Sequence, residues 1–238
     1  MKTPMKKSRP GPAADRPATA VDSAVKRLRR AVMYGQFLPG QKLMEASLCK
    51  ELGISRPSLR EALRVLETEG LIELVPNYGP RVARLDERDV EEIQEVWSLL
   101  TGRAAFLFAR IADAQDMAAL ETAYDNGQHI IRSGTSMELL TASNDFFQAM
   151  VSRCGNKTLY DVITRLASRV NFLRSQVLLH HRVQDQYAQE LSEIMQALRT
   201  RTPAAARRAV ERHIAWVCHC AARMLTPVVP HEDFALSL

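Results

Sequence analysis

Serine and arginine side chains gather in the first two turns of a predicted helix that begins near residue 55. Ser55, Arg56, Ser58 and Arg60 lie on its polar side, and its apolar side carries Leu59, Ala62, Leu63 and Leu66. An arginine can donate two hydrogen bonds to guanine O6 and N7, and a helix that enters the major groove presents base-reading side chains from its first turns. The pattern favours DNA binding, although an ordinary amphipathic surface helix also carries such charges.

Local signals place this helix as the third in a small domain. Gly53 is a typical residue just beyond a helix end, Ser55 is a typical N-cap, and Pro57 is tolerated in a first turn. In chain order the sequence predicts a helix from Val21 to Gly35, a short helix over 44–52, a helix over 55–69, and extended runs over 71–75 and 81–85. Three helices and a β-hairpin over residues 21–85 predict a winged helix-turn-helix.

The charge of the chain is uneven. The net charge is +5, but residues 1–20 carry five Lys or Arg and one acidic residue, residues 21–85 carry eleven and seven, and residues 86–238 carry sixteen and nineteen. A basic first third indicates an anionic partner, with double-stranded DNA the first candidate. Residues 1–20 contain Pro, Ala and Lys and no apolar run, so we expect a disordered basic tail.

Everything after residue 85 has a helical pattern. Asp86 is a predicted N-cap, and Asp89 stands in the capping-box position three residues later. The predicted helices span 87–112, 114–132, 136–154, 157–179, 184–200 and 203–225. The fold class is therefore mainly α, with the winged helix-turn-helix followed by an all-α six-helix bundle over 86–225 and a C-terminal tail over 226–238.

The sequence argues against several other classes of protein. The longest uninterrupted apolar run, from Ala104 to Ala109, has six residues, whereas a membrane helix needs about 20. Four cysteines without a secretory signal do not indicate a disulfide framework. There is no Gly-rich phosphate loop and no nucleophile signature. We expect a cytoplasmic protein that has no membrane contact and is not an enzyme.

The first domain contains four short sequence motifs in this order along the chain: G-Q-F-L-P-G-Q-K-L from Gly35, L-G-I-S-R-P-S-L-R-E-A-L from Leu52, E-G-L-I from Glu69 and P-N-Y-G from Pro76. Together they resemble the N-terminal signature of the GntR superfamily of bacterial transcription regulators. The resemblance implies a homodimer on a near-palindromic DNA operator, with the recognition helix in the major groove and the wing tip in the minor groove. By position it implies DNA contacts from Ser55, Arg56, Ser58, Arg60, Asn77, Tyr78 and Gly79.

The helical domain is similar to the FCD effector-binding domain of FadR- and VanR-type members. Many of these hold a metal with an Asp and three His, and use it with an Arg to bind a small carboxylate. The four ligand positions correspond here to Asn144, Gln148, Leu191 and His213. An amide is a poor ligand for a divalent metal and leucine is none. We therefore expect neither a metal nor another cofactor.

The same positions imply an effector pocket. Trp97 and Thr101 stand where the family has an Arg and a Glu, so an aromatic wall replaces a charged anchor and favours a larger or less polar ligand. Asn144 and His213 lie on apolar stripes of their helices, and with Gln148 they are expected to line the cavity. A hydrogen-bonded core histidine with no ligand role is the alternative for His213.

These observations predict a sequence-specific transcriptional regulator, with repression as the expected action. Its effector would be a small organic molecule, either a carboxylate or an aromatic metabolite. The alternative is a ligand-independent regulator whose helical domain serves only as a scaffold for dimerisation.

Overall fold

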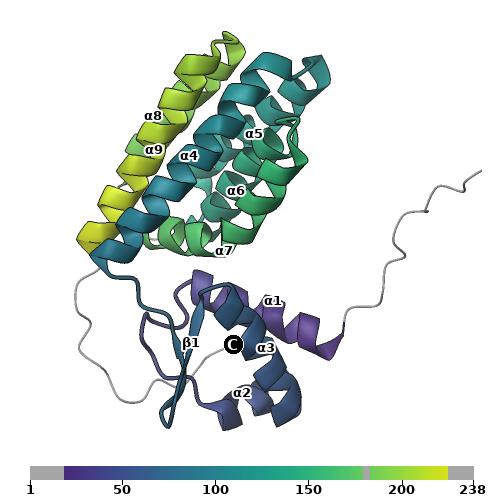
Figure 1. Ribbon diagram of the computed structural model, residues 1–238, viewed down its shortest axis with the longest axis vertical. Coiled ribbons are helices and arrows are strands. Elements are labelled where there is room, and N and C mark those ends of the chain that lie inside the picture. The colour runs from purple at the N-terminus through teal and green to yellow at the C-terminus, as the bar shows by residue number, and fades with distance from the viewer. Residues whose placement is uncertain (1–18, 179–182, 225–238) are drawn as a thin grey trace, which may run out of the picture.

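The computed structural model describes residues 19–178 and 183–224 of the 238-residue chain. The C-terminal tail predicted over 226–238 lies outside these ranges, as does the predicted basic tail except for its last two residues. The described chain forms a small domain and a larger helical domain, joined where α4 begins (Figure 1). Within these ranges every helix is too short or too polar to span a lipid bilayer.

The small domain has the predicted winged helix-turn-helix architecture. Its elements are α1 (Ala20–Met33), α2 (Glu45–Leu52), α3 (Arg56–Thr68), β1 (Ile72–Val75) and β2 (Gly79–Val82). Thr19 starts α1 with a capping box, because its Oγ1 accepts from the Asp22 N–H at 3.1 Å and its own N–H donates to the Asp22 carboxylate at 2.9 Å. Gly53, with a φ of 67°, ends α2 in the left-handed conformation that glycine tolerates best.

The second strand lies earlier than the predicted range of 81–85, so that range is wrong. In the antiparallel pair Ile72 faces Val82 and Val75 faces Gly79. Asn77 and Gly79 take positive φ angles of 62° and 94°, which turn the chain within fewer residues than the proline spacing indicated. The segment 40–43 pairs with the free edge of β2, since the Leu43 N–H donates to the Pro80 carbonyl at 2.8 Å.

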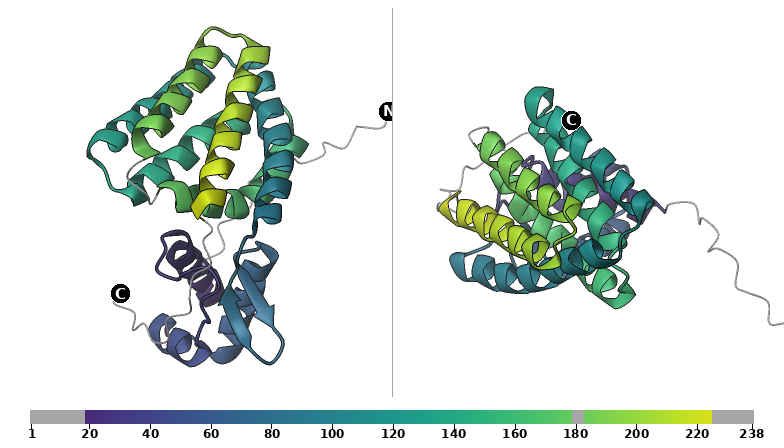
Figure 2. Two further views of the ribbon diagram at one scale, coloured as in Figure 1. Left: turned by 90° about the vertical axis from the view of Figure 1, so that its left-hand side faces the viewer. Right: turned by 90° about the horizontal axis from the view of Figure 1, so that it is seen from above.

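Six helices form the larger domain, and their bounds agree with the predicted ranges to within two residues. They are α4 (Glu87–Ile111), α5 (Ala114–Ser133), α6 (Ser136–Ser152), α7 (Lys157–Leu178), α8 (Gln184–Arg199) and α9 (Pro203–Met224). Asp86, Asp113 and Thr135 each begin a helix with a capping box, which explains why these boundaries could be predicted. α4 runs alongside α9, while α7 lies at the end of the bundle nearest the small domain (Figures 1 and 2).

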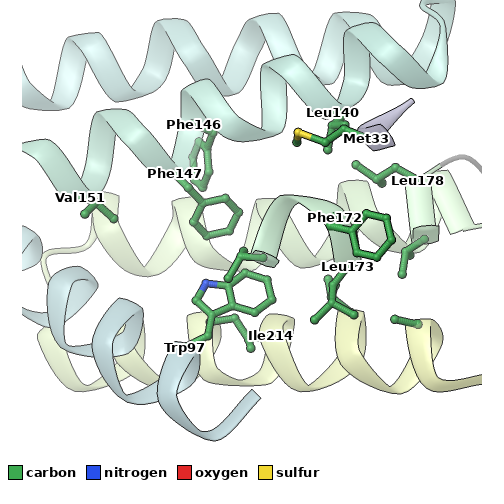
Figure 3. Close-up of a cluster of buried hydrophobic side chains, with 14 of the residues drawn as sticks. Met33, Trp97, Leu140, Phe146, Phe147, Val151, Phe172, Leu173, Leu178 and Ile214 are labelled. Carbon is green, nitrogen blue, oxygen red and sulfur yellow. The ribbon is translucent and has the colours of Figure 1, made fainter. Parts of the chain in front are cut away.

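The apolar core is continuous between the two domains. Figure 3 shows Met33, from the end of α1, next to Leu140 of α6 and close to Leu178 of α7. All three side chains are buried. Burying one side chain of this size stabilises the fold by about 1.5–3 kcal/mol relative to leaving it exposed. The position of the small domain is therefore set partly by packing against α6 and α7.

Candidate nucleic-acid interface and ligand cavity

The recognition helix α3 buries one face and leaves its basic face in solvent. Leu59, Ala62, Leu63 and Leu66 are buried, as the predicted apolar side requires. Ser55 is the N-cap, and its Oγ accepts from the Ser58 N–H at 3.3 Å and lies 3.0 Å from the Ser58 Oγ. This bonding fixes the first turn of α3 and leaves its neighbouring arginine side chains free to point outward.

The two predicted arginines differ in their contacts. The Arg60 side chain is 65% exposed, and its Nε lies 3.3 Å from Glu45 Oε2 at the start of α2. Arg56 is exposed and forms no ion pair with the described residues. An exposed ion pair of this kind contributes about 0–1 kcal/mol, so a phosphate or a base could replace Glu45 at small cost.

Arg64 extends this surface and was not among the predicted contacts. It is exposed on α3, one turn beyond Arg60 and two turns beyond Arg56. Residues four apart on a helix lie on one face, so the spacing of the three arginines was a signal in the sequence. The resulting arginine row, defined as Arg56, Arg60 and Arg64, runs along the exposed side of the helix.

The wing tip brings together the remaining predicted contact residues. Asn77, Tyr78 and Gly79 form the tight turn of the hairpin, and the Tyr78 side chain is 51% exposed. The Lys42 Nζ lies 4.5 Å from the centre of the Tyr78 ring, within the range of a cation–π contact. This places a positive charge beside the turn, and a basic wing suits the negative potential of a DNA groove.

A cavity of about 210 Å³ lies between α4, α6 and α7 in the helical domain. Four of the predicted effector residues line it, namely Trp97, Thr101, Asn144 and Gln148. Its other lining residues are mostly apolar and include Phe147, Val151 and Val170. Figure 3 shows the rings of Trp97 and Phe147 close to each other, from α4 and α6. The cavity is smaller than the 300–1,000 Å³ typical of pockets for drug-sized ligands, so it fits a small molecule.

Arg174 of α7 also lines this cavity, and the sequence analysis missed it. Its guanidinium carbon lies 5.4 Å from the centre of the Trp97 ring and 4.7 Å from that of Phe147. Its Nη1 donates to Asn144 Oδ1 at 2.7 Å and to Asn171 Oδ1 at 3.1 Å. The signal in the sequence was an arginine on the apolar stripe of α7, four residues after Val170 and three before Val177.

The charge of Arg174 is buried without a described counter-charge. Its side chain is 2% exposed, no ion pair joins it to a carboxylate of the described residues, and its Nε has no hydrogen-bond partner among them. Burial lowers the pKa of this guanidinium, against the opposing influence of Tyr187 and Cys218. An unpaired buried cation is costly in a folded protein. The arrangement is suited to an anion that enters the cavity and shares the guanidinium with the two asparagines.

His213 of α9 lies behind the cavity wall rather than among the residues that line it. Its ring stacks on Phe147 with the centres 5.4 Å apart, and it meets the Tyr187 ring edge-on at 5.2 Å. Neither ring nitrogen has a hydrogen-bond partner among the described residues. Burial, together with the nearby charge of Arg174, lowers the pKa of His213 to about 3, so the ring is neutral at ordinary pH.

The positions that correspond to the family's metal ligands do not fit a divalent metal. Leu191 is buried and has no donor atom. The Asn144 Oδ1 already accepts from the Arg174 guanidinium, and that cation would repel a metal ion at the same place. Within the described ranges no three His, Cys, Asp or Glu side chains lie close enough to share a metal.

Comparisons with known proteins agree with this architecture. The profile of the bacterial regulatory proteins of the gntR family matches residues 20–82, and the FCD domain profile matches residues 92–215. The Bacillus subtilis (strain 168) HTH-type transcriptional regulator YdhC is 27% identical over 161 residues, which are 67% of this chain and 72% of that protein. The Glc operon transcriptional activator of Escherichia coli (strain K12) is 27% identical over 79% of this chain and 83% of its own length.

Solved structures show the same fold. E. coli McbR/YncC superposes with a TM-score of 0.70 at 19% sequence identity, covering 86% of this chain and 98% of that one. The FCD match alone spans more than half of the sequence, and the other profile covers the winged helix-turn-helix. The chain therefore belongs to the GntR family of bacterial transcriptional regulators and carries an FCD domain.

Proposed function

We propose that this regulator binds a near-palindromic operator as a homodimer, represses transcription, and responds to a small organic anion held in the FCD cavity. The observation that carries the effector assignment is the buried guanidinium of Arg174, which lines the cavity and forms no ion pair with a described carboxylate. Asp145, the carboxylate among the described lining residues, is exposed. The arginine row and the wing tip support DNA contacts by Ser55, Arg56, Ser58, Arg60, Asn77, Tyr78 and Gly79.

The shape and polarity of the cavity narrow the class of effector. Trp97 and Phe147 supply flat apolar walls, and Arg174 with Asn144 supplies one polar end. The volume of about 210 Å³ suits a molecule of about one ring. A small monocarboxylic acid with an aromatic or alicyclic body matches these features. The guanidinium supplies the positive charge at the polar end, so we propose that this acid binds without a metal.

Thermal denaturation of the full chain tests this assignment. Benzoate and cyclohexanecarboxylate, each added after treatment with EDTA, should raise the melting temperature, because a ligand that binds only the folded state stabilises it. Benzamide has nearly the shape of benzoate but no charge, and it should have little effect. If none of the acids stabilises the protein, with or without zinc, the scaffold alternative is favoured over effector binding.

The DNA part of the proposal has its own test. Duplexes selected from a random library by the full-length protein should contain two related half-sites in inverted order, with centres about 10–10.5 base pairs or a multiple apart. Sedimentation of the complex should give two chains per duplex. Deleting the gene should raise expression from a reporter that carries a selected site, whereas a fall in expression would identify an activator.

A further inference from the structure

Helix α7 takes part in two sites at once. Its residues Ala167, Asn171 and Arg174 line the cavity. Ser168, which follows Ala167 and precedes Asn171 by three residues, faces the small domain, where its Oγ donates to Glu69 Oε2 at 3.0 Å. A single turn of one helix therefore carries both the cavity wall and a contact with the DNA-binding domain.

Glu69 joins three helices at the end of the recognition helix. It is the C-cap residue of α3, the helix that carries the arginine row. Its Oε2 accepts from Arg29 Nε of α1 at 2.8 Å and its Oε1 from Arg29 Nη2 at 2.5 Å, in addition to the hydrogen bond from Ser168. Only 21% of the Glu69 side chain is exposed. Burial by itself raises the pKa of Glu69, but the hydrogen bonds from Arg29 and Ser168 and the charge of Arg29 together lower it by more. The net pKa is below the usual value, so the carboxylate stays charged.

Close packing surrounds this polar contact. Gly70, which follows Glu69, has a φ of 70°, and a Cβ placed there would lie 2.7 Å from the Arg169 Nε. Arg169 of α7 therefore covers the backbone at the end of α3. On the other side, Met33 of α1 is buried next to Leu140 and Leu178 (Figure 3). The end of α3 cannot keep this geometry if α7 shifts along or around its axis, because packed interfaces adapt by discrete rearrangement.

We infer that the hydrogen bond from Ser168 to Glu69 is the coupling contact through which occupation of the FCD cavity changes the setting of the recognition helix. A change in the cavity acts on Ala167 and Asn171, and Ser168 must move with them because all three lie within one turn of a helix. Glu69 then either follows, carrying the end of α3 with it, or loses the bond. The inference rests on the proposed function for its trigger, since it takes the cavity to be the effector site.

The test uses the full chain and needs neither an identified effector nor an operator. Thr101 lies on α4, is 1% exposed, lines the cavity and has an Oγ1 without a partner among the described residues. Thr101→Leu fills part of the cavity, whereas Thr101→Val removes the hydroxyl at nearly the same volume and serves as the control. Gln148→Phe, at an exposed position of the cavity lining, is a second filling variant in case the first does not fold.

The readout is amide hydrogen exchange in the peptide that covers residues 64–72, which contains the end of α3 and belongs to the other domain. Filling the cavity should change exchange there by at least about fivefold, the lower end of typical allosteric coupling. Thr101→Val should leave it near the parent rate. In a Ser168→Ala background the filling variants should have no effect on this peptide, and Ser168→Thr, which keeps the hydroxyl, should restore the effect.

Two results would overturn the coupling role. One is an unchanged rate of amide hydrogen exchange in residues 64–72 when the cavity is filled in the parent. The other is an equal change in that rate with and without the Ser168 hydroxyl, which would make this hydrogen bond a structural contact only. The outcome is separate from the effector proposal, because a cavity that binds none of the acids can still pass this test, and a cavity that binds benzoate can still fail it.

Discussion

The two domains hold their candidate functional cations in opposite environments. In the DNA-binding domain the arginine row lies in solvent, and Arg60 pairs there with the partly buried carboxylate of Glu45. In the FCD domain Arg174 is buried under two aromatic rings and bonded to two asparagines. An exposed arginine costs the fold almost nothing, while a buried one without a counter-charge reduces stability. Arg174 is therefore the residue whose destabilising burial a bound anion would offset.

The domains also differ in what their functional residues do for the fold. Ser55 both caps α3 and belongs to the predicted DNA-binding surface, so one side chain serves structure and function. Arg174 could be replaced by an apolar side chain of similar size with little loss of stability, because such replacements of buried charges are often neutral or stabilising. The following predictions test this contrast.

The largest expected effect is that of Arg174→Met on ligand binding. Removing one partner of a buried, hydrogen-bonded charge pair costs about 2–5 kcal/mol of binding free energy. Calorimetric titration with benzoate should therefore show a loss of more than tenfold in affinity, while urea unfolding of the free variant should show equal or greater stability than the parent. Arg165→Met, at an exposed position of the same helix, is the control. Equal benzoate affinity in the parent and in Arg174→Met would contradict the anion assignment.

Acid should destabilise the FCD domain through His213. The folded state keeps the pKa near 3, while the unfolded chain has the ordinary value near 6.5, so the unfolded state binds the extra proton as the pH falls below 6.5. Stability is lost between about pH 6.5 and 3, and at pH 5 the loss relative to pH 7 is about 2 kcal/mol. His213→Leu should remove this component of the pH dependence in urea unfolding. His129→Gln, at an exposed position, should retain it, and a flat profile in the parent would argue against a buried neutral ring.

Arg60→Ala should weaken operator binding by about 1–3 kcal/mol if Arg60 reads a base. Fluorescence anisotropy with a selected duplex measures the loss, and binding to that duplex should become less selective against single base changes. Arg208→Ala removes the same charge from an exposed position on α9 and controls for general electrostatics. If the two variants bind alike, Arg60 does not read a base.

The smallest effect is expected from Ser55→Ala, which removes the N-cap of α3. Loss of such a cap costs about 1 kcal/mol of unfolding free energy. Chemical denaturation should show this decrease together with weaker operator binding, since the first turn of the recognition helix loosens. Ser192→Ala, on the exposed face of α8, should change neither quantity. An unchanged midpoint in Ser55→Ala would mean that the serine hydroxyl contributes little to holding the helix start.

Much of the fold could be predicted from short-range signals. The helix starts at Asp86, at Ser55 and at Pro203 were visible because capping and first-turn preferences depend on neighbouring residues. The second hairpin strand was misplaced because the turn depends on the positive φ of Asn77, which the proline spacing around it did not indicate. Pairing of segment 40–43 with β2 is a contact between distant parts of the chain, and no local pattern predicted it.

The predicted sites divide in the same way. The residues on α3 and the wing could be named from the sequence because they are neighbours on one helix or in one turn. Four of the five predicted cavity residues do lie together, whereas His213 lies one layer behind Phe147. Arg174 was missed because Trp97, at the position where the family has an arginine, indicated that the cavity has no charged side chain. The structure places a guanidinium beside the Trp97 ring from another helix, α7.

By itself the sequence determined the family, the domain boundary near residue 85 and the exposed basic surface, because these depend on residue type, spacing and local capping. Only the tertiary structure decided which buried charge has no counter-charge among the described residues, and which helix touches both the cavity and the recognition helix. Burial and pairing are properties of side chains brought together from α4, α6 and α7. The spacing along the chain does not specify how those helices pack, so it could not reveal the environment of Arg174 or the contact between Ser168 and Glu69.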